Sequence, residues 1–120
     1  MIKRVLVLED SPERVEWLQN NANNVDFYFC KDVSVAKGLL KLQKFDAMYL
    51  DHDLGGDKPT GYDFAKILAK EILEGRITNK PNICIHTSNP IGAENMKSVL
   101  PQAVIRPFYE LIKKGLRYVN

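Results

Sequence analysis

The sequence predicts a single α/β domain in which five parallel strands form one sheet with helices on both faces. Short apolar runs alternate with amphipathic stretches along the whole chain, in the order expected of five strand–helix units. The length of 120 residues suits one domain. Right-handed crossovers between parallel strands place the intervening helices on the two faces of the sheet. We therefore expect one domain over residues 1–120.

Five segments are predicted to be strands because they are short, apolar and rich in β-branched and aliphatic residues. Their ranges are residues 4–8, 25–30, 45–51, 83–86 and 103–105.

The first two helices have recognisable start signals. Residues 11–13 (SPE) place a serine cap, a first-turn proline and an acid at a helix N-terminus, and this helix should end within residues 20–24. Either Asp32 or Ser34 caps the second helix. Its apolar positions recur at helical spacing and are Val35, Ala36, Leu39, Leu40 and Leu42.

Three further helices follow. Thr60 is expected to cap a helix over residues 61–74, and Gly75 should close it. Its apolar positions include Phe64, Ile67, Leu68 and Leu73. Residues 91–100 form a short helix, and residues 108–119 form the last one. The last helix should direct Leu111, Ile112 and Leu116 inward.

Composition excludes several classes of protein. Hydrophobic residues make up 45% and charged residues 27%, as in ordinary soluble domains. The net charge of +2 gives no case for a general nucleic-acid-binding surface. No apolar run approaches the ~18 residues of a membrane span or the core of a signal peptide. We expect a cytoplasmic protein without a membrane partner, with Cys30 and Cys84 as buried free thiols inside strands.

Four acidic residues follow two of the predicted strands. Glu9 and Asp10 come after the first strand, and Asp51 and Asp53 come at the end of the third. Ligands of parallel α/β sheets collect at the carboxyl ends of the strands, so these carboxylates should converge if the strands are neighbours. Clustered carboxylates are costly unless a divalent cation, most naturally Mg2+, neutralises them. The sequence therefore predicts a metal site and phosphate chemistry.

The acidic residues follow the first and third predicted strands in the order found in a known family, and the whole chain resembles the receiver domain of two-component response regulators. This resemblance, to receivers like the chemotaxis regulator, implies a flavodoxin-like fold. The resemblance implies that Glu9-Asp10 holds Mg2+, that Asp51 is the phosphoacceptor, and that Asp53 lies where receivers bind the metal through a backbone carbonyl.

The resemblance extends to the last two strands. Thr87 stands where receivers have a threonine or serine after the fourth strand. Arg106-Pro107 stands in place of their lysine–proline pair, which implies a changed geometry for binding phosphate and a cis peptide bond before the proline. Guanidinium offers a bidentate fork where ammonium is a point charge.

Two segments resemble a narrower subgroup. The stretches LDHDLGG and HTSNPIGAENM look like those of receiver-like proteins predicted to process cyclic phosphates, a family tied by inference to RNA end repair. Ordinary receivers seldom carry Asp-His-Asp after the third strand or a histidine at the position of His86.

Each candidate site residue has two interpretations. Asp51 is a nucleophile that attacks phosphorus, or it is a capping or turn aspartate; its companion acids favour the nucleophile. Glu9 and Asp10 are metal ligands or helix caps, and Asp53 is a metal ligand or an exposed loop acid.

The candidate residues after the fourth and fifth strands are expected to bind the phosphate group or to transfer a proton to it. His86 protonates a leaving oxygen, or it is a partly buried histidine with a structural hydrogen bond, and the structural interpretation is favoured for His52. Thr87 or Ser88 donates a hydrogen bond to a phosphoryl oxygen, and Arg106 binds phosphate.

Two functions follow. The first is a Mg2+-dependent enzyme that acts on phosphate esters, cyclic ones among them, in a small molecule or at an RNA end. The second is a stand-alone receiver that a histidine kinase phosphorylates on Asp51 and that signals through the face of its fourth helix, fifth strand and fifth helix. The extra acid, the two histidines and the arginine favour the enzyme. A third alternative, a binding scaffold without chemistry, is disfavoured because Glu9, Asp10 and Asp51 are present.

Overall fold

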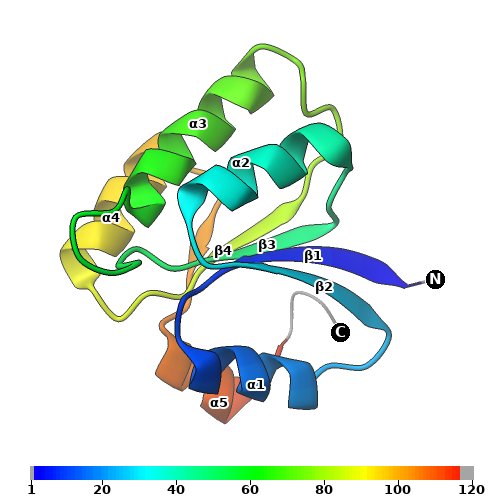
Figure 1. The fold of residues 1–120 in the computed structure, drawn as a ribbon, viewed down its shortest axis with the longest axis vertical. Helices are drawn as coiled ribbons and strands as arrows, with labels where there is room; N and C mark the ends of the chain where they lie inside the picture. Colours follow the sequence, from blue (N-terminus) through cyan, green and yellow to red (C-terminus); the bar gives the residue numbers. More distant parts are fainter. Residues whose placement is uncertain (1, 117–120) are drawn as a thin grey trace.

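A computed structural model describes residues 2–116 and contains one parallel sheet of five strands. The strand order is β2-β1-β3-β4-β5 (Figure 1). The strands are β1 (Lys3–Leu8), β2 (Val25–Cys30), β3 (Ala47–Leu50), β4 (Asn82–Ile85) and β5 (Val104–Ile105). This architecture confirms the predicted fold class.

Helices cover both faces of the sheet. They are α1 (Pro12–Asn20), α2 (Val33–Leu42), α3 (Gly61–Leu73), α4 (Pro90–Val99) and α5 (Phe108–Lys114). Figure 1 shows α2, α3 and α4 on one face and α1 with α5 on the other. None of the helices within residues 2–116 combines the length and apolar character that crossing a membrane requires.

The central strand β1 supplies side chains to two cores because successive side chains of a strand point to opposite faces. Leu6 and Leu8 pack in the core under α2, α3 and α4. Val5 and Val7 pack in the core under α1 and α5. All four side chains are fully buried, which is why this segment reads as a continuous apolar run.

The helix caps largely follow the predicted signals. Ser11 caps α1, and its hydroxyl accepts a hydrogen bond from the amide of Arg14. Asp32, rather than Ser34, caps α2. Thr60 caps α3 through a capping box in which the Asp63 carboxylate accepts from the Thr60 amide.

Some helix positions differ from the prediction. Four apolar side chains at helical spacing are exposed, namely Val35, Leu42, Leu73 and Ile112. Leu42 and Leu73 are the last residues of their helices, so no further helical turn covers them. The last helix ends at Lys114 because Gly115 takes a positive φ of 77°, which terminates helices. The predicted end at Val119 lies outside the described residues.

Two details concern chemistry away from the site. Cys30 and Cys84 are buried free thiols, as predicted, and burial raises the pKa of each to about 12. The peptide bond between Arg106 and Pro107 is trans, so the expectation of a cis bond is wrong.

Candidate active site at the carboxyl ends of the strands

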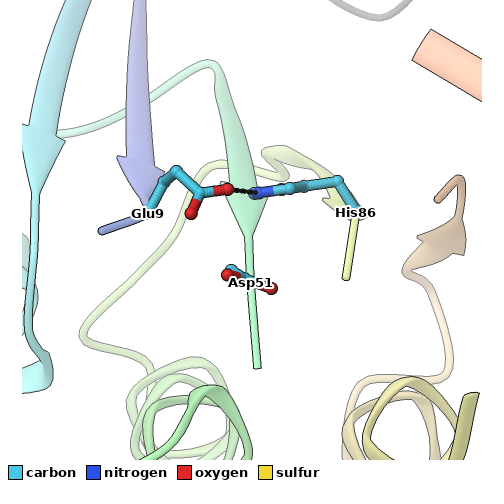
Figure 2. A group of neighbouring side chains, drawn as sticks. All are labelled: Glu9, Asp51 and His86. Carbon is cyan, nitrogen blue, oxygen red and sulfur yellow. Dashed lines mark hydrogen bonds and ion pairs between the residues drawn. The ribbon is translucent and has the colours of Figure 1, made fainter. Parts of the chain in front are cut away.

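Strand register places three polar residues side by side. Leu8 of β1 pairs with Leu50 of β3, and Leu50 pairs with Ile85 of β4. The next residues along these strands are Glu9, Asp51 and His86. The ladder continues through them, because the Asp51 amide donates to Leu8 O at 3.0 Å and the His86 amide donates to Leu50 O at 3.0 Å. Figure 2 shows the three side chains meeting beyond the ends of their strands.

Glu9 and His86 form a buried pair. Nε2 of His86 lies 2.8 Å from Oε1 of Glu9, and both side chains are almost completely inaccessible (Figure 2). The second carboxylate oxygen of Glu9 accepts from the amides of Asp10 and Ser11 at 3.0 and 3.1 Å. Burial acts to raise the pKa of Glu9, but the hydrogen bond and charge of His86, the Ser11 amide and Arg14 together lower it to about 2. Glu9 is therefore ionised near neutral pH.

Asp51 is 4% exposed and sits between the ends of β1 and β4. Its Oδ1 accepts a hydrogen bond of 2.8 Å from the His52 amide. Burial raises the pKa of Asp51, the charge of His86 opposes that change, and the charge of Glu9 adds to it. Hydrogen bonds from His52 and the Thr87 hydroxyl act in the lowering direction but do not cancel the effect of burial.

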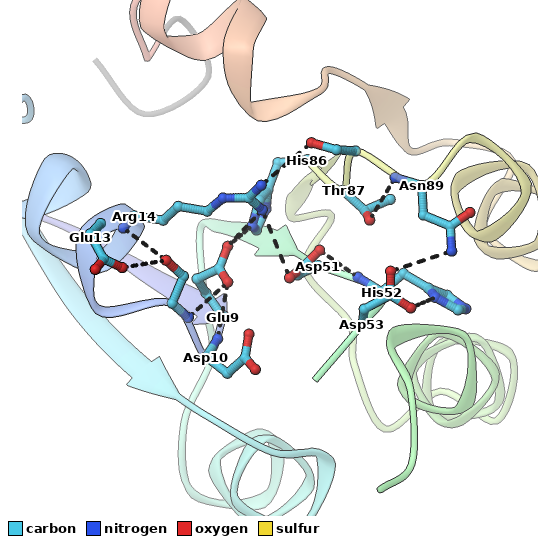
Figure 3. Close-up of polar contacts among 12 residues, drawn as sticks. Glu9, Asp10, Glu13, Arg14, Asp51, His52, Asp53, His86, Thr87 and Asn89 are labelled. Atoms are coloured by element: carbon cyan, nitrogen blue, oxygen red, sulfur yellow. Dashed lines mark hydrogen bonds and ion pairs between the residues drawn. The ribbon is translucent and has the colours of Figure 1, made fainter. Parts of the chain in front are cut away.

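Arg14 is the residue that the sequence analysis missed. Its guanidinium extends from the first turn of α1 towards the Glu9–Asp51 pair, with Nη1 lying 3.4 Å from Glu9 Oε1 and 3.9 Å from Asp51 Oδ2 (Figure 3). It also lies over the ring of Phe108, 5.0 Å from the centroid. The sequence signal is weak, since nothing in a lone arginine four positions after Asp10 shows which way it points.

These side chains surround a cavity of about 300 Å³. The cavity is lined by Glu9, Asp10, Ser11, Arg14, Asp51, Asp53 and Thr87. All four predicted metal-ligating acids are present in this lining. Asp53 is 66% exposed on its side chain and also pairs with His52 and Asn89, so it is both a cavity acid and an exposed loop acid.

Other predicted site residues lie outside the lining of this cavity. Nη1 of Arg106 donates to Glu110 at 3.4 Å. Ser88 is exposed, and its hydroxyl accepts from Arg14 at 3.4 Å. His52 turns its ring towards Asp53 and against Gly92, where an added Cβ would come within 2.5 Å of the imidazole. His86 is fully buried, and its Nε2 bonds to Glu9, which lines the cavity.

The structure also contains a donor set that could hold a metal ion. One ligand atom from each of Glu9, Asp51 and His86 lies within 4.8 Å of the others. Two carboxylates and an imidazole suit divalent cations, and the further carboxylates of Asp10 and Asp53 line the same cavity.

Comparisons with known proteins agree with this geometry. A family model described as the cyclic-phosphate processing receiver domain matches residues 4–102. A search of curated proteins found no significant match.

Several solved structures share the fold. The response regulator TrrA from Thermotoga maritima, in complex with Mg2+ and beryllium fluoride, is 18% identical, with a TM-score of 0.68 over 99% of this chain and 100% of that one. The receiver domain of the histidine kinase CKI1 from Arabidopsis thaliana, complexed with Mg2+ and BeF3−, is 16% identical, with a TM-score of 0.65 over 98% of this chain and 89% of that one. The response regulatory domain of mrkE from Klebsiella pneumoniae is 21% identical, with a TM-score of 0.62 over 87% and 80%. At such identities, the likeness shows the fold alone.

Proposed function

This chain belongs to the family of cyclic-phosphate processing receiver domains, and from that premise we propose that it binds Mg2+ and carries out phosphate-ester chemistry at Asp51. The predicted resemblance to receiver domains is confirmed. The observation that carries the proposal is the buried meeting of Glu9, Asp51 and His86 beside a cavity lined by two more carboxylates. The proposed substrates are cyclic phosphates, in a small molecule or at an RNA end, and the proposed location is the cytoplasm.

The residues present fit a magnesium ion. Mg2+ prefers oxygen ligands and keeps several waters, and the cavity offers carboxylates from both strand ends. Glu9 is ionised, and the pKa of Asp51 is raised mainly by burial, with a further contribution from the negative charge of Glu9. When bound, the ion supplies positive charge that offsets the repulsion between Asp51 and a phosphate.

Asp51 acts as the nucleophile in this proposal. One of its carboxylate oxygens forms a bond to phosphorus, and one ring P–O bond of the cyclic phosphodiester breaks. The released oxygen takes a proton from solvent. Water then hydrolyses the acyl phosphate, which restores the Asp51 carboxylate and leaves a phosphate monoester. The sum is one cyclic phosphodiester plus one water giving one monoester.

The other residues bind and orient. The Thr87 hydroxyl borders the cavity beside Asp51 and is proposed to donate to a phosphoryl oxygen. His86 holds Glu9 in place, so its proposed contribution in this arrangement is positioning, while direct protonation of a leaving oxygen stays a prediction. The phosphate-binding role of Arg106 also stays a prediction, since its guanidinium contacts Glu110.

The first experiment measures hydrolysis of a nucleoside 2′,3′-cyclic monophosphate with and without Mg2+. We expect turnover that requires Mg2+ and falls at least about a hundredfold in Asp51→Asn, because the nucleophile is lost. Asp57→Asn is the matched control, since Asp57 is an exposed acid of the loop after β3 and does not line the cavity. Equal turnover in Asp51→Asn and wild type would refute the proposed chemistry.

A second candidate is a phosphorelay receiver, phosphorylated on Asp51 by a histidine kinase and signalling through α4, β5 and α5. Its support is that two of the similar structures are receivers with Mg2+ and a beryllium fluoride bound. Incubation with Mg2+ and acetyl phosphate, followed by intact-mass measurement, tests it. A stable gain of one phosphoryl group that Asp51→Asn abolishes, without hydrolysis of a cyclic phosphate, favours this candidate over the enzyme.

A further inference from the structure

The acidic cavity contains one basic side chain. Among its seven described lining residues, Arg14 is the only one with a positive charge, against the four carboxylates of Glu9, Asp10, Asp51 and Asp53. A phosphate that approaches Asp51 must pass these carboxylates. A fixed cation on the cavity wall lowers the electrostatic cost of that approach.

The guanidinium of Arg14 makes polar contacts, but these contacts do not use all of its hydrogen-bond donors. Its contacts with Glu9 Oε1 and Ser88 Oγ are both 3.4 Å, and the separation from Asp51 Oδ2 is 3.9 Å. Charge-assisted hydrogen bonds close to about 2.7–2.9 Å when they are strong, so Arg14 forms no tight bidentate pair with either acid. A guanidinium has five N–H donors, and the contacts within residues 2–116 use only Nη1 and Nη2.

The position of Arg14 is fixed by packing rather than by these polar contacts. The guanidinium carbon lies 5.0 Å from the centroid of the Phe108 ring, and the side chain remains 28% exposed. Stacking on an aromatic ring orients the plane of a guanidinium while leaving its N–H edge available. Phe108 in turn packs edge-on against Trp17 of α1. The side chain is therefore preorganised for a ligand in the cavity.

The hydroxyl that Arg14 contacts belongs to Ser88, in the loop after β4. Ser88 follows Thr87, and Thr87 borders the cavity beside Asp51. The Arg14 guanidinium and the Thr87 hydroxyl both line the cavity near Asp51 (Figure 3), and the Ser88 hydroxyl accepts a hydrogen bond from Arg14 beside them. The donors of Arg14 and Thr87 match the several oxygens of a phosphate group.

We infer that Arg14 is the phosphate-binding cation of this cavity, with Ser88 supporting its guanidinium from just outside the lining, and that the ligand is the oxyanion of a phosphate ester or of inorganic phosphate. The inference rests on the proposed function, whose substrate phosphate it locates. It gives to an arginine of α1 the role that the sequence pattern assigned to Arg106. Without a phosphate, Arg14 is a counter-cation of Glu9 and Asp51, so it opposes the binding of Mg2+.

Calorimetry on purified variants tests the inference, with Mg2+ alone as the first ligand and inorganic phosphate added to the Mg2+-saturated protein as the second. We expect Arg14→Gln to weaken phosphate binding at least about tenfold, and Arg14→Lys and Ser88→Ala to weaken it less. Affinity for Mg2+ should be retained or should rise in Arg14→Gln. A merely unfolded variant would lose both ligands. Arg76→Gln is the matched control, because Arg76, which follows α3, pairs with Glu71 and Glu74 at the end of that helix and does not line the cavity.

Three results separate the proposals. Unchanged phosphate affinity in Arg14→Gln, or a larger loss in Arg106→Gln than in Arg14→Gln, overturns the inference. Phosphate binding that depends on Arg14, without hydrolysis of any cyclic phosphate, supports the inference and refutes only the catalytic proposal. A wild-type protein that binds Mg2+ but no phosphate overturns the inference and leaves the catalytic proposal to the hydrolysis assay.

Discussion

Each end of the sheet carries a cavity, and the larger cavity is not the one where the charged residues converge. The cavity at the amino end has about 500 Å³, against about 300 Å³ at the carboxyl end. Its lining is Ile72, Asn79, Lys80, Pro81, Asn82, Ile83, Gln102 and Val104, a set without a carboxylate. The smaller cavity brings four carboxylates, a guanidinium and two hydroxyls together. Convergence of charge, rather than volume, is the reason for proposing the carboxyl end as the functional one.

The two ends also differ in how tightly their residues are constrained. At the carboxyl end the polar residues Glu9, Asp51 and His86 are buried and bonded to one another or to backbone amides. At the amino end the acid next to β3, Asp46, is exposed and accepts one hydrogen bond from the Arg4 amide. Substitutions should therefore be costly at the carboxyl end and mild at the amino end.

The largest expected contrast is between two glycines at opposite ends of α3. A Cβ on Gly61 would lie 1.8 Å from the carbonyl oxygen of Asp51, so Gly61→Ala forces the backbone at Asp51 to move. We expect a loss of about 3 kcal/mol or more in the free energy of unfolding. A Cβ on Gly75 would meet no atom within 4 Å, and its φ of +77° should cost Gly75→Ala only about 1 kcal/mol. Urea unfolding of both variants measures the difference, and equal losses would contradict it.

A smaller contrast concerns two acids. Glu9→Gln removes the charge that His86 and Arg14 face, and we expect it to lower the free energy of unfolding by about 2 kcal/mol, since hydrogen bonds to buried charged groups are strong. Asp46→Asn keeps an acceptor for the Arg4 amide at an exposed position, and the change should stay within about 0.5 kcal/mol. Thermal unfolding of both at near-neutral pH is the measurement. A Glu9→Gln protein as stable as Asp46→Asn would show that the buried pair contributes no net stability.

The smallest effect concerns the start of α3, which lies at the carboxyl end. Thr60→Ala removes the side-chain cap and should lower the free energy of unfolding by about 1 kcal/mol.

The hydrogen bond from the Thr60 amide holds the pKa of Asp63 below its usual 3.8. This carboxylate therefore stabilises the fold above that pH, and its contribution is lost as the pH falls further. Chemical unfolding between pH 5 and pH 3 should show a shallower acid loss in Asp63→Asn than in wild type. An identical slope would remove Asp63 from the acid response.

How much of this structure the sequence predicts depends on how far apart in the chain the interacting residues lie. Strands and caps are local, so apolar runs and the signals at Ser11 and Thr60 locate them, and the acids that follow β1 and β3 predict the cavity. The pairing of Glu9 with His86 joins residues 77 positions apart, and a sequence cannot show which side chain a buried histidine faces. The position of the Arg14 guanidinium is harder still to predict from the sequence, because it depends on packing against the Phe108 ring of α5.

The alignment of β1, β3 and β4 has a consequence for how this domain can diverge. Glu9, Asp51 and His86 lie side by side because the three adjacent strands end at paired residues. The loops that follow the strands contribute to the cavity wall, but they do not set this register. Insertions into the exposed turn over residues 55–59 should therefore be tolerated and could reshape the entrance for a different substrate. A single residue added inside β3 would swing every later side chain of that strand to the opposite face and dismantle the site while leaving the topology intact.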